Sequence, residues 1–235
     1  VQQVGPNLDV PVATGNPSLL GACLPGLFPG HPIEHLTPSG YRAGNMSSSI
    51  TDTEERALRA LASLEDDMVG FVQDLVCMPS LPGDEGPCQQ RVAMELRGLG
   101  MDVEVLECRH SELEHHPAFC DDGFDPVGRI DVLGFWEGDG GTRGTGSLIL
   151  NGHVDVVPTG DPSLWRGDPF SGEVLDGRIW GRGSCDMKAG LAAGIFAVAA
   201  LKRAGVRVDR DVKIQSVVGE ETDSRGARHL VESGM

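Results

Sequence analysis

The chain has 235 residues, enough for one sizeable domain. Lys and Arg total 19 against 35 for Asp and Glu, so the formal net charge is −16. A surface this acidic repels the phosphates of nucleic acids and of anionic membranes, so we expect neither as a partner.

The cysteines and the start of the chain bear on localisation. None of the six cysteines forms a C-x-x-C pair, and a chain of this size does not depend on disulfides, so we expect reduced thiols. We expect no apolar run of the roughly 18 residues that a membrane helix needs. A basic stretch followed by an apolar one, the pattern of a secretory signal, is not seen at the start. These observations predict a cytoplasmic protein.

Residues 1–45 differ in composition from the rest of the chain. They hold seven Pro and seven Gly, and only Asp9, Glu34 and Arg42 carry a charge. Neither helical nor strand periodicity is seen at this density of structure-breaking residues. We expect residues 1–45 to be a disordered leader, or upstream sequence translated ahead of a start at Met46.

Helical patterns begin after this segment. Thr51 and Glu54 have the spacing of a capping box. Apolar residues then recur at three- and four-residue steps from Leu61 to Leu75, which predicts an amphipathic helix ending near Pro79. Further helices are predicted over 87–100, where Pro87 suits the first turn, and over 188–204.

Short apolar segments alternate with these helices. We predict strands at Asp102–Leu106, Arg129–Trp136, Ser147–Asn151 and Asp211–Val218. The Gly-rich segment Glu137–Gly146 suits a hairpin turn between the second and third of these strands. Helices interleaved with short strands predict an α/β fold, a three-layer sandwich whose mixed sheet is partly parallel.

One predicted strand leads directly into His153-Val154-Asp155. Residues two apart face the same side of an extended backbone, so Asp155 can reach the imidazole of His153. A carboxylate that orients a metal-bound histidine is a common supporting group in metal sites. Taken alone, a His-x-Asp sequence fits a surface turn or a satisfied pair more often than a metal site.

Asp186 follows a turn with two glycines and precedes the predicted helix 188–204. Taken alone it fits a helix N-cap. It also fits a carboxylate whose two oxygens bridge two cations. The neighbouring Cys185 could ligate zinc, but carboxylate and imidazole ligands already suit such a site.

Glu220 and Glu221 stand side by side at the end of the last predicted strand. In isolation they fit a solvated turn. In the alternative interpretation Glu221 binds a metal and Glu220 takes the proton from a metal-bound water. Together the clusters supply His, Asp and Glu ligands plus a spare acid at strand ends, a set that favours Zn²⁺, with Co²⁺ or Mn²⁺ as substitutes.

At these residues the sequence resembles the metallopeptidase and deacylase family that includes acetylornithine deacetylase, succinyl-diaminopimelate desuccinylase, carboxypeptidase G and aminoacylase. The resemblance runs from about Leu64 to Met235. The segments that carry it are Asn151–Pro158, Trp165 with Asp168-Pro169-Phe170, Gly177–Gly190 and Gly219–Glu221.

The resemblance implies a role for each site residue. His153 would bind one of two zinc ions, Asp186 would bridge both, and Glu221 would bind the second. Asp155 would orient His153, and Glu220 would act as the general base. It also implies a cis peptide bond between Asp186 and Met187.

The chain also departs from the family pattern. The family supplies another acidic ligand soon after the Glu pair and a histidine far toward the carboxyl terminus, and neither precedes Met235. We therefore expect residues 46–235 to be the amino-terminal part of a catalytic domain, ending before the lid or dimerisation domain. Such a fragment should bind metal weakly and turn over little or no substrate, and the resemblance makes a homodimer possible in the full-length protein. The histidines that do not match the missing ligand's motif, expected on the surface, are His110, His115, His116 and His229.

The segment Glu112–Phe119 resembles the branch with acetylornithine deacetylase-like enzymes and a formyl-aminopyrimidine deformylase. The first expectation is therefore hydrolysis of an N-acyl amino acid, with acetylornithine as the leading substrate. A metallodipeptidase or carboxypeptidase would use the same metal site. An inactive fragment that binds a partner through the surface a lid normally covers is the alternative from another class.

Overall fold

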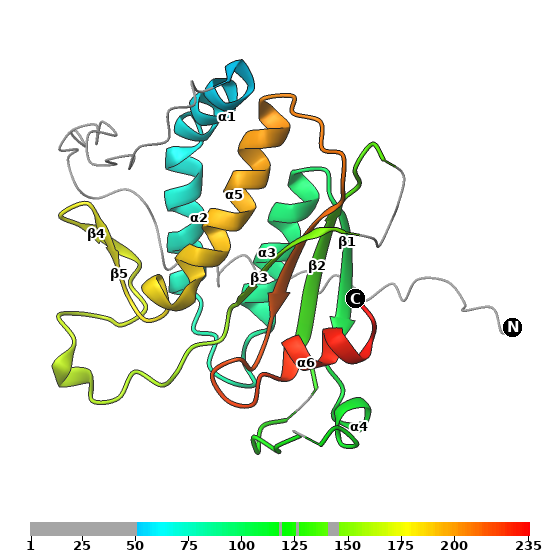
Figure 1. The fold of residues 1–235 in the computed structure, drawn as a ribbon. Helices are drawn as coiled ribbons and strands as arrows, with labels where there is room; N and C mark the ends of the chain where they lie inside the picture. The colour runs from blue at the N-terminus through cyan, green and yellow to red at the C-terminus, as the bar shows by residue number, and fades with distance from the viewer. Residues whose placement is uncertain (1–50, 118, 126, 141–145) are drawn as a thin grey trace, which may run out of the picture. The chain divides into compact units, whose positions relative to one another are not determined.

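The computed structural model describes residues 51–117, 119–125, 127–140 and 146–235. The expected leader 1–45 lies outside these residues. The central element of the described part is a sheet whose strands are β1 (Asp102–Glu107), β2 (Ile130–Trp136), β3 (Leu148–His153) and β6 (Val212–Val217) (Figure 1). β3 and β6 run parallel, whereas β1–β2 and β2–β6 are antiparallel. The predicted α/β fold with a mixed sheet is confirmed.

The predicted hairpin across Glu137–Gly146 is wrong. The strand order is β1-β2-β6-β3, so β6 lies between the two strands that the hairpin would join. β6 is the more buried strand and Ile214 is fully buried, whereas Leu148 and Ile149 of β3 are exposed at the edge. The strand that buries the most apolar surface therefore lies at the centre of the sheet. β3 is connected to β6 through a helical crossover, as parallel neighbouring strands require.

Helices cover one face of the sheet. They are α1 (Asp52–Ala62), α2 (Glu65–Cys77), α3 (Gly86–Gly98) and α5 (Ala189–Arg203). α3 packs on β1 and β2, α5 packs on β3 and β6, and α1 and α2 pack against α5 (Figure 1). Side chains alternate between the two faces of a strand. Accordingly, Ile214 joins the core under these helices, while Leu133 and Val217 pack on the other face against Leu230 of α6 (Arg225–Glu232).

The predicted helix from Thr51 to Pro79 is two helices. The capping box at its start is confirmed, because the Glu54 N–H donates to Thr51 Oγ1 at 3.2 Å and the Thr51 N–H donates to Glu54 Oε2 at 2.7 Å. α1 then ends at Ala62, where the Ser63 hydroxyl donates to the Ala60 carbonyl at 2.7 Å. The apolar periodicity continues across this break, and for that reason periodicity did not reveal it.

One helical stretch among the described residues, Ser184–Arg203, is long and apolar enough to cross a membrane by length and composition alone. The prediction that no run reaches this length is therefore wrong. Within it, Leu191, Ile195 and Phe196 are buried in the core, so packing against the sheet explains the apolar composition.

Several short elements were not predicted. They are α4 (His110–Leu113), the one-turn helix η1 (Pro162–Leu164), the irregular turn η2 (Ser184–Lys188), the hairpin strands β4 (Glu173–Leu175) and β5 (Arg178–Trp180), and α6. In the described part of the chain, Cys88, Cys108, Cys120 and Cys185 are free thiols.

Candidate metal centre

One edge of the sheet gathers the predicted site residues. β3 and β6 run parallel and pair at His153 and Val217, so His153 and the Glu220–Glu221 turn leave the sheet at the same edge. Asp186 lies in η2, which leads into α5. One ligand atom from each of His153, Asp186 and Glu221 lies within 4.8 Å of the other two. The structure thus brings together three residues that are far apart in the sequence.

His153 is buried, and both of its ring nitrogens face acceptors. Its Nδ1 lies 3.0 Å from the backbone oxygen of Asp155 and 3.5 Å from Oδ1 of the same residue. Its Nε2 lies 3.4 Å from Asp186 Oδ1 and 3.6 Å from Glu220 Oε2. Because a carbonyl can only accept, Nδ1 carries the hydrogen and Nε2 faces the acids.

Asp155 connects two parts of the site. Its carboxylate is fully buried, and Oδ2 accepts the backbone N–H of Glu221 at 3.0 Å. Oδ1 has no hydrogen-bond partner in the described part of the chain, and its nearest charged neighbour is His153. Asp155 therefore holds the His153 ring and the Glu221 turn together, and sequence reasoning had not anticipated the role of its backbone carbonyl.

The pKa values reflect an excess of negative charge. Burial alone would lower the pKa of His153, but the hydrogen bond and charge of Asp155 outweigh it and raise that pKa to about 9. Burial raises the pKa of the Glu221 carboxyl, and the nearby acids add to this shift. Burial would raise the pKa of Asp155 as well, but the neighbouring His153 and the hydrogen bond from the Glu221 N–H lower it.

These observations test whether the residues fit a metal ion. Four carboxylates, those of Asp155, Asp186, Glu220 and Glu221, surround one imidazole, and one buried oxygen is unpaired. A divalent cation between them would offset the repulsion. The side chains of Asp186 and Glu220 are 78% and 50% exposed, so the centre is open to a substrate. The donor set fits a metal site with an open face.

Cys185 is not part of this group. It is exposed, and the group of mutually close ligand atoms consists of His153, Asp186 and Glu221. The peptide bond between Asp186 and Met187 is cis, as the resemblance implied.

A buried arginine supports the acidic turn from below. Arg129 donates through Nε and Nη2 to Glu85 Oε1 at 3.1 and 2.8 Å, and through Nη1 to Asp122 Oδ2 at 2.5 Å. A methyl group added at Gly219 would lie 2.9 Å from Arg129 Nη2, so the guanidinium packs directly against the turn before Glu220. Sequence reasoning missed Arg129, since hydropathy patterns do not reveal a buried cation.

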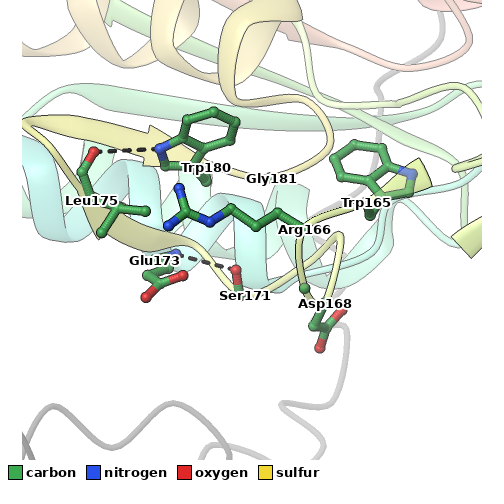
Figure 2. Close-up of a pocket in the computed structure, with 9 residues that line it drawn as sticks. Trp165, Arg166, Asp168, Ser171, Glu173, Leu175, Trp180 and Gly181 are labelled. Carbon is green, nitrogen blue, oxygen red and sulfur yellow. Dashed lines mark hydrogen bonds between the residues drawn. The ribbon is translucent and has the colours of Figure 1, made fainter. Parts of the chain in front are cut away.

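The residues Trp165 and Asp168 lie outside the metal group. They line a small pocket beside the β4–β5 hairpin, together with Arg166, Gly167, Ser171, Glu173, Leu175, Trp180 and Gly181 (Figure 2). The Trp165 indole N–H donates to the Thr159 carbonyl at 2.8 Å, and Asp168 Oδ1 accepts the Phe170 N–H at 2.9 Å. These contacts fix the loop that precedes the hairpin.

One of the histidines expected on the surface is not there. His115 is exposed and His116 is partly exposed, but His229 is only 4% exposed, so the prediction for His229 is wrong. Its Nδ1 lies 2.9 Å from Asp131 Oδ2, and this buried hydrogen bond offsets the cost of removing the ring from water.

Comparisons with known proteins agree with the resemblance. Residues 149–235 match the family model described as Peptidase family M20/M25/M40. The succinyl-diaminopimelate desuccinylase of Rhodospirillum centenum is 37% identical over 132 residues, which is 56% of this chain and 30% of the relative. A desuccinylase of Cereibacter sphaeroides is 36% identical over 131 residues, 56% of this chain and 29% of the relative. The chain thus spans about a third of the length of these relatives.

Solved structures show the same fold. Human carnosine dipeptidase 1 has a TM-score of 0.59 at 22% identity, covering 76% of this chain and 37% of that one. A di-peptidase from Saccharomyces cerevisiae has a TM-score of 0.62 at 18% identity, covering 75% of this chain and 37% of that one. The matched segment holds His153, Asp186, Glu220 and Glu221, so the predicted resemblance is confirmed: residues 149–235 are similar to the M20/M25/M40 peptidases.

Proposed function

We propose that the protein containing this chain is a zinc-dependent hydrolase that cleaves the amide bond of a small N-acyl amino acid. The observation that carries this proposal is the grouping of His153, Asp186 and Glu221 within 4.8 Å, with Glu220 Oε2 3.6 Å from His153 Nε2. Succinyl-diaminopimelate desuccinylases are among the relatives of this chain, and the activity in their name falls in this substrate class.

His153, Asp186 and Glu221 would hold the metal. Bound divalent ions would supply Lewis acidity, which polarises an amide carbonyl and lowers the pKa of water. The Nδ1 contact to the Asp155 carbonyl keeps Nε2 of His153 directed at the acids, and the N–H of Glu221 is held by the Asp155 carboxylate. Asp155 is therefore a positioning residue for two ligands at once.

Glu220 is the residue suited to move the proton. Its side chain is half exposed, and it stands beside the ligand group without being one of the three mutually close ligands. Its carboxylate takes one proton from the attacking water and delivers it to the nitrogen of the leaving amine as the C–N bond breaks. The products are a carboxylate and a free amine, so the atoms balance with one water consumed.

The substrate is proposed at the level of its class. The resemblance around Glu112–Phe119 favours acetylornithine, and relatives of this chain include succinyl-diaminopimelate desuccinylases. Both substrates have an acyl group on the amine of an amino acid. N-acyl amino acids are therefore the proposed substrate class, and the substrate assay identifies the acyl group.

The test begins with the intact mass of the polypeptide purified from its own source, compared with the 24.9 kDa of this chain. The same preparation is then assayed against a panel of substrates. Amine release is measured from N-acetyl, N-succinyl and N-formyl amino acids and from dipeptides. Glu220→Gln should lower kcat at least about 100-fold, as loss of a general base does, with metal content unchanged. Glu65→Gln, an exposed acid in the first turn of α2, is the matched control and should leave kcat unaltered.

Three outcomes would contradict the proposal. Hydrolysis of dipeptides alone would make the protein a peptidase. Tight metal binding without hydrolysis of any substrate would favour a binding module. Full activity in Glu220→Gln would remove that residue from its role as base.

A further inference from the structure

A second group of metal-ligand side chains lies apart from the His153 centre. One ligand atom from each of Cys108, Asp131 and His229 lies within 4.8 Å of the other two, and the residues are 0%, 0% and 4% exposed. Cys108 follows β1, Asp131 lies in β2 and His229 lies in α6. Three elements that are distant in sequence thus bring a thiol, a carboxylate and an imidazole into one buried position.

The contacts around the group orient its members. His229 Nδ1 lies 2.9 Å from Asp131 Oδ2, while His229 Nε2 lies 3.3 Å from Glu112 Oε2. The other oxygen of Asp131 accepts the Val218 N–H at 3.1 Å. Glu112 is about half exposed, so its carboxylate can move toward the group and provide a fourth donor. A backbone N–H and a second acid around the ligands are the supporting contacts that metal sites commonly show.

The group is separate from the His153 centre. His153 pairs with Val217 of β6, and Val132 of β2 pairs with Ser216, so Asp131 lies on the far side of Val217 from His153. Two inter-strand spacings amount to about 10 Å. The ligand atoms form two separate groups, and the two groups share no residue.

We propose that Cys108, Asp131 and His229 form a structural site for a zinc-class transition-metal ion. A thiolate with an imidazole and carboxylate oxygens is a donor set that zinc and cobalt accept, whereas Mg²⁺ and Ca²⁺ prefer oxygen alone. The ligands are buried with no open face toward substrate, which is the arrangement of a structural site. Binding would displace the Cys108 thiol proton to solvent and join β1, β2 and α6 through one ion.

The competing explanation is a metal-free hydrogen bond. In that case Asp131 and His229 simply fix α6 on the sheet, and Cys108 fills space as a small apolar side chain. The two explanations differ in one measurable property, which is whether the sulfur of Cys108 bonds to a metal.

Cobalt titration of the full chain measures this property directly. A cobalt–thiolate bond gives a charge-transfer absorption in the near ultraviolet, and the His153 group contains no sulfur. We expect this band in the wild type, its loss in Cys108→Ala, and its retention in Cys185→Ala, which removes the thiol next to Asp186. It should also persist in Glu221→Gln, so failure of the proposed hydrolase site would leave this result intact.

Absence of the band in the wild type, or its persistence in Cys108→Ala, would overturn the proposal. Circular dichroism checks that the variants fold. Anomalous diffraction at the zinc edge needs no variant at all. Wild-type crystals grown with zinc should show a peak between Cys108 Sγ and the His229 ring, and a map without that peak would overturn the proposal even if Cys108→Ala failed to fold.

Discussion

Arg129 lies beneath the turn that carries Glu220 and Glu221, and its replacement by Met tests how much a buried ion pair stabilises this fold. The side chains of Arg129 and Glu85 are both 0% exposed, and that of Asp122 is 3% exposed. Arg129→Met keeps most of the side-chain volume, so little of the effect comes from a cavity. What the change removes is the cation between two buried carboxylates.

The expected loss can be worked out from these contacts. Asp122 keeps a partner in the variant, because Arg225 Nη2 lies 2.8 Å from its Oδ1. Glu85 loses both hydrogen bonds to Arg129 and is left as an uncompensated buried charge. Removing one partner of a buried pair costs about 3–5 kcal/mol, a large share of the roughly 5–15 kcal/mol that stabilises a typical domain.

Urea unfolding followed by circular dichroism measures this loss. Arg207→Met is the matched control, since Arg207 forms an ion pair with Asp139 at 2.6 Å on an exposed part of the surface, and its unfolding midpoint should not change measurably. Adding Glu85→Gln to Arg129→Met should recover about 1–3 kcal/mol, because a neutral orphaned group is less costly than a charged one. A loss below about 1 kcal/mol, or no recovery in the double variant, would refute the reasoning.

Three further predictions concern pH, the buried lysine and the acidic turn. Burial would raise the pKa of the Asp122 carboxyl, but its hydrogen bond to Arg129 lowers that pKa below the unfolded value of about 3.9. Asp122 therefore stabilises the fold above about pH 3.9, and this contribution is lost as the pH falls through the lower folded pKa. Asp122→Asn should reduce the fall of the urea midpoint at acid pH, and a pH dependence equal to that of the wild type would contradict this prediction. Lys188 Nζ donates to two backbone carbonyls at the end of α2, at 2.7 and 3.0 Å. Lys188→Met leaves both carbonyls without this donor and should lower the free energy of unfolding in urea by about 1–3 kcal/mol. An unaltered urea midpoint would indicate that water replaces the lysine as donor. Gly219→Ala should lower the zinc affinity measured by calorimetry more than Gly160→Ala does. Both glycines have a positive φ, but only at Gly219 would the new methyl group meet Arg129. An equal loss of affinity in the two variants would exclude the contact with Arg129 as the cause.

The candidate metal group could be predicted from the sequence because each of its residues lies in a short, recognisable pattern. His153 ends β3, Glu221 lies in the turn after β6, and Asp186 follows a glycine turn before a helix. Strands joined by a helical crossover run parallel, so their carboxyl ends meet at one edge. Local patterns together with this rule predict that the side chains meet, and the structure has them within 4.8 Å.

The order of the strands was not accessible in the same way. β2 and β3 are neighbours in the chain and are joined by a Gly-rich segment, which favours a hairpin locally. The strand that separates them, β6, comes after the whole of α5. Its central position buries Ile214 on one face of the sheet and Val217 on the other, a non-local gain that no short window of sequence contains.

Buried polar residues were missed for a related reason. The buried side of α6 consists of Arg225, Gly226, His229 and Leu230, and only the last of these is a large apolar residue. A method that finds buried faces from apolar periodicity assigns such a helix to the surface. His229 was assigned to the surface because it does not match the missing ligand's motif, and no helical pattern indicated the buried position in which Asp131 pairs with it.

Exposed carboxylates and buried arginines lie at the same edge of the sheet, so a change in the buried arginines should affect both the stability of the fold and the candidate metal centre. Asp122 accepts from Arg129 and Arg225, and the Thr222 hydroxyl, next to Glu221, donates to the same carboxylate at 3.3 Å. The Arg129 guanidinium also packs against Gly219, directly before Glu220 and Glu221. Loss of Arg129 should therefore shift the turn that carries the ligand Glu221, and so weaken metal binding as well as folding. An exposed arginine such as Arg207 has no such connection, and replacing it should change neither property.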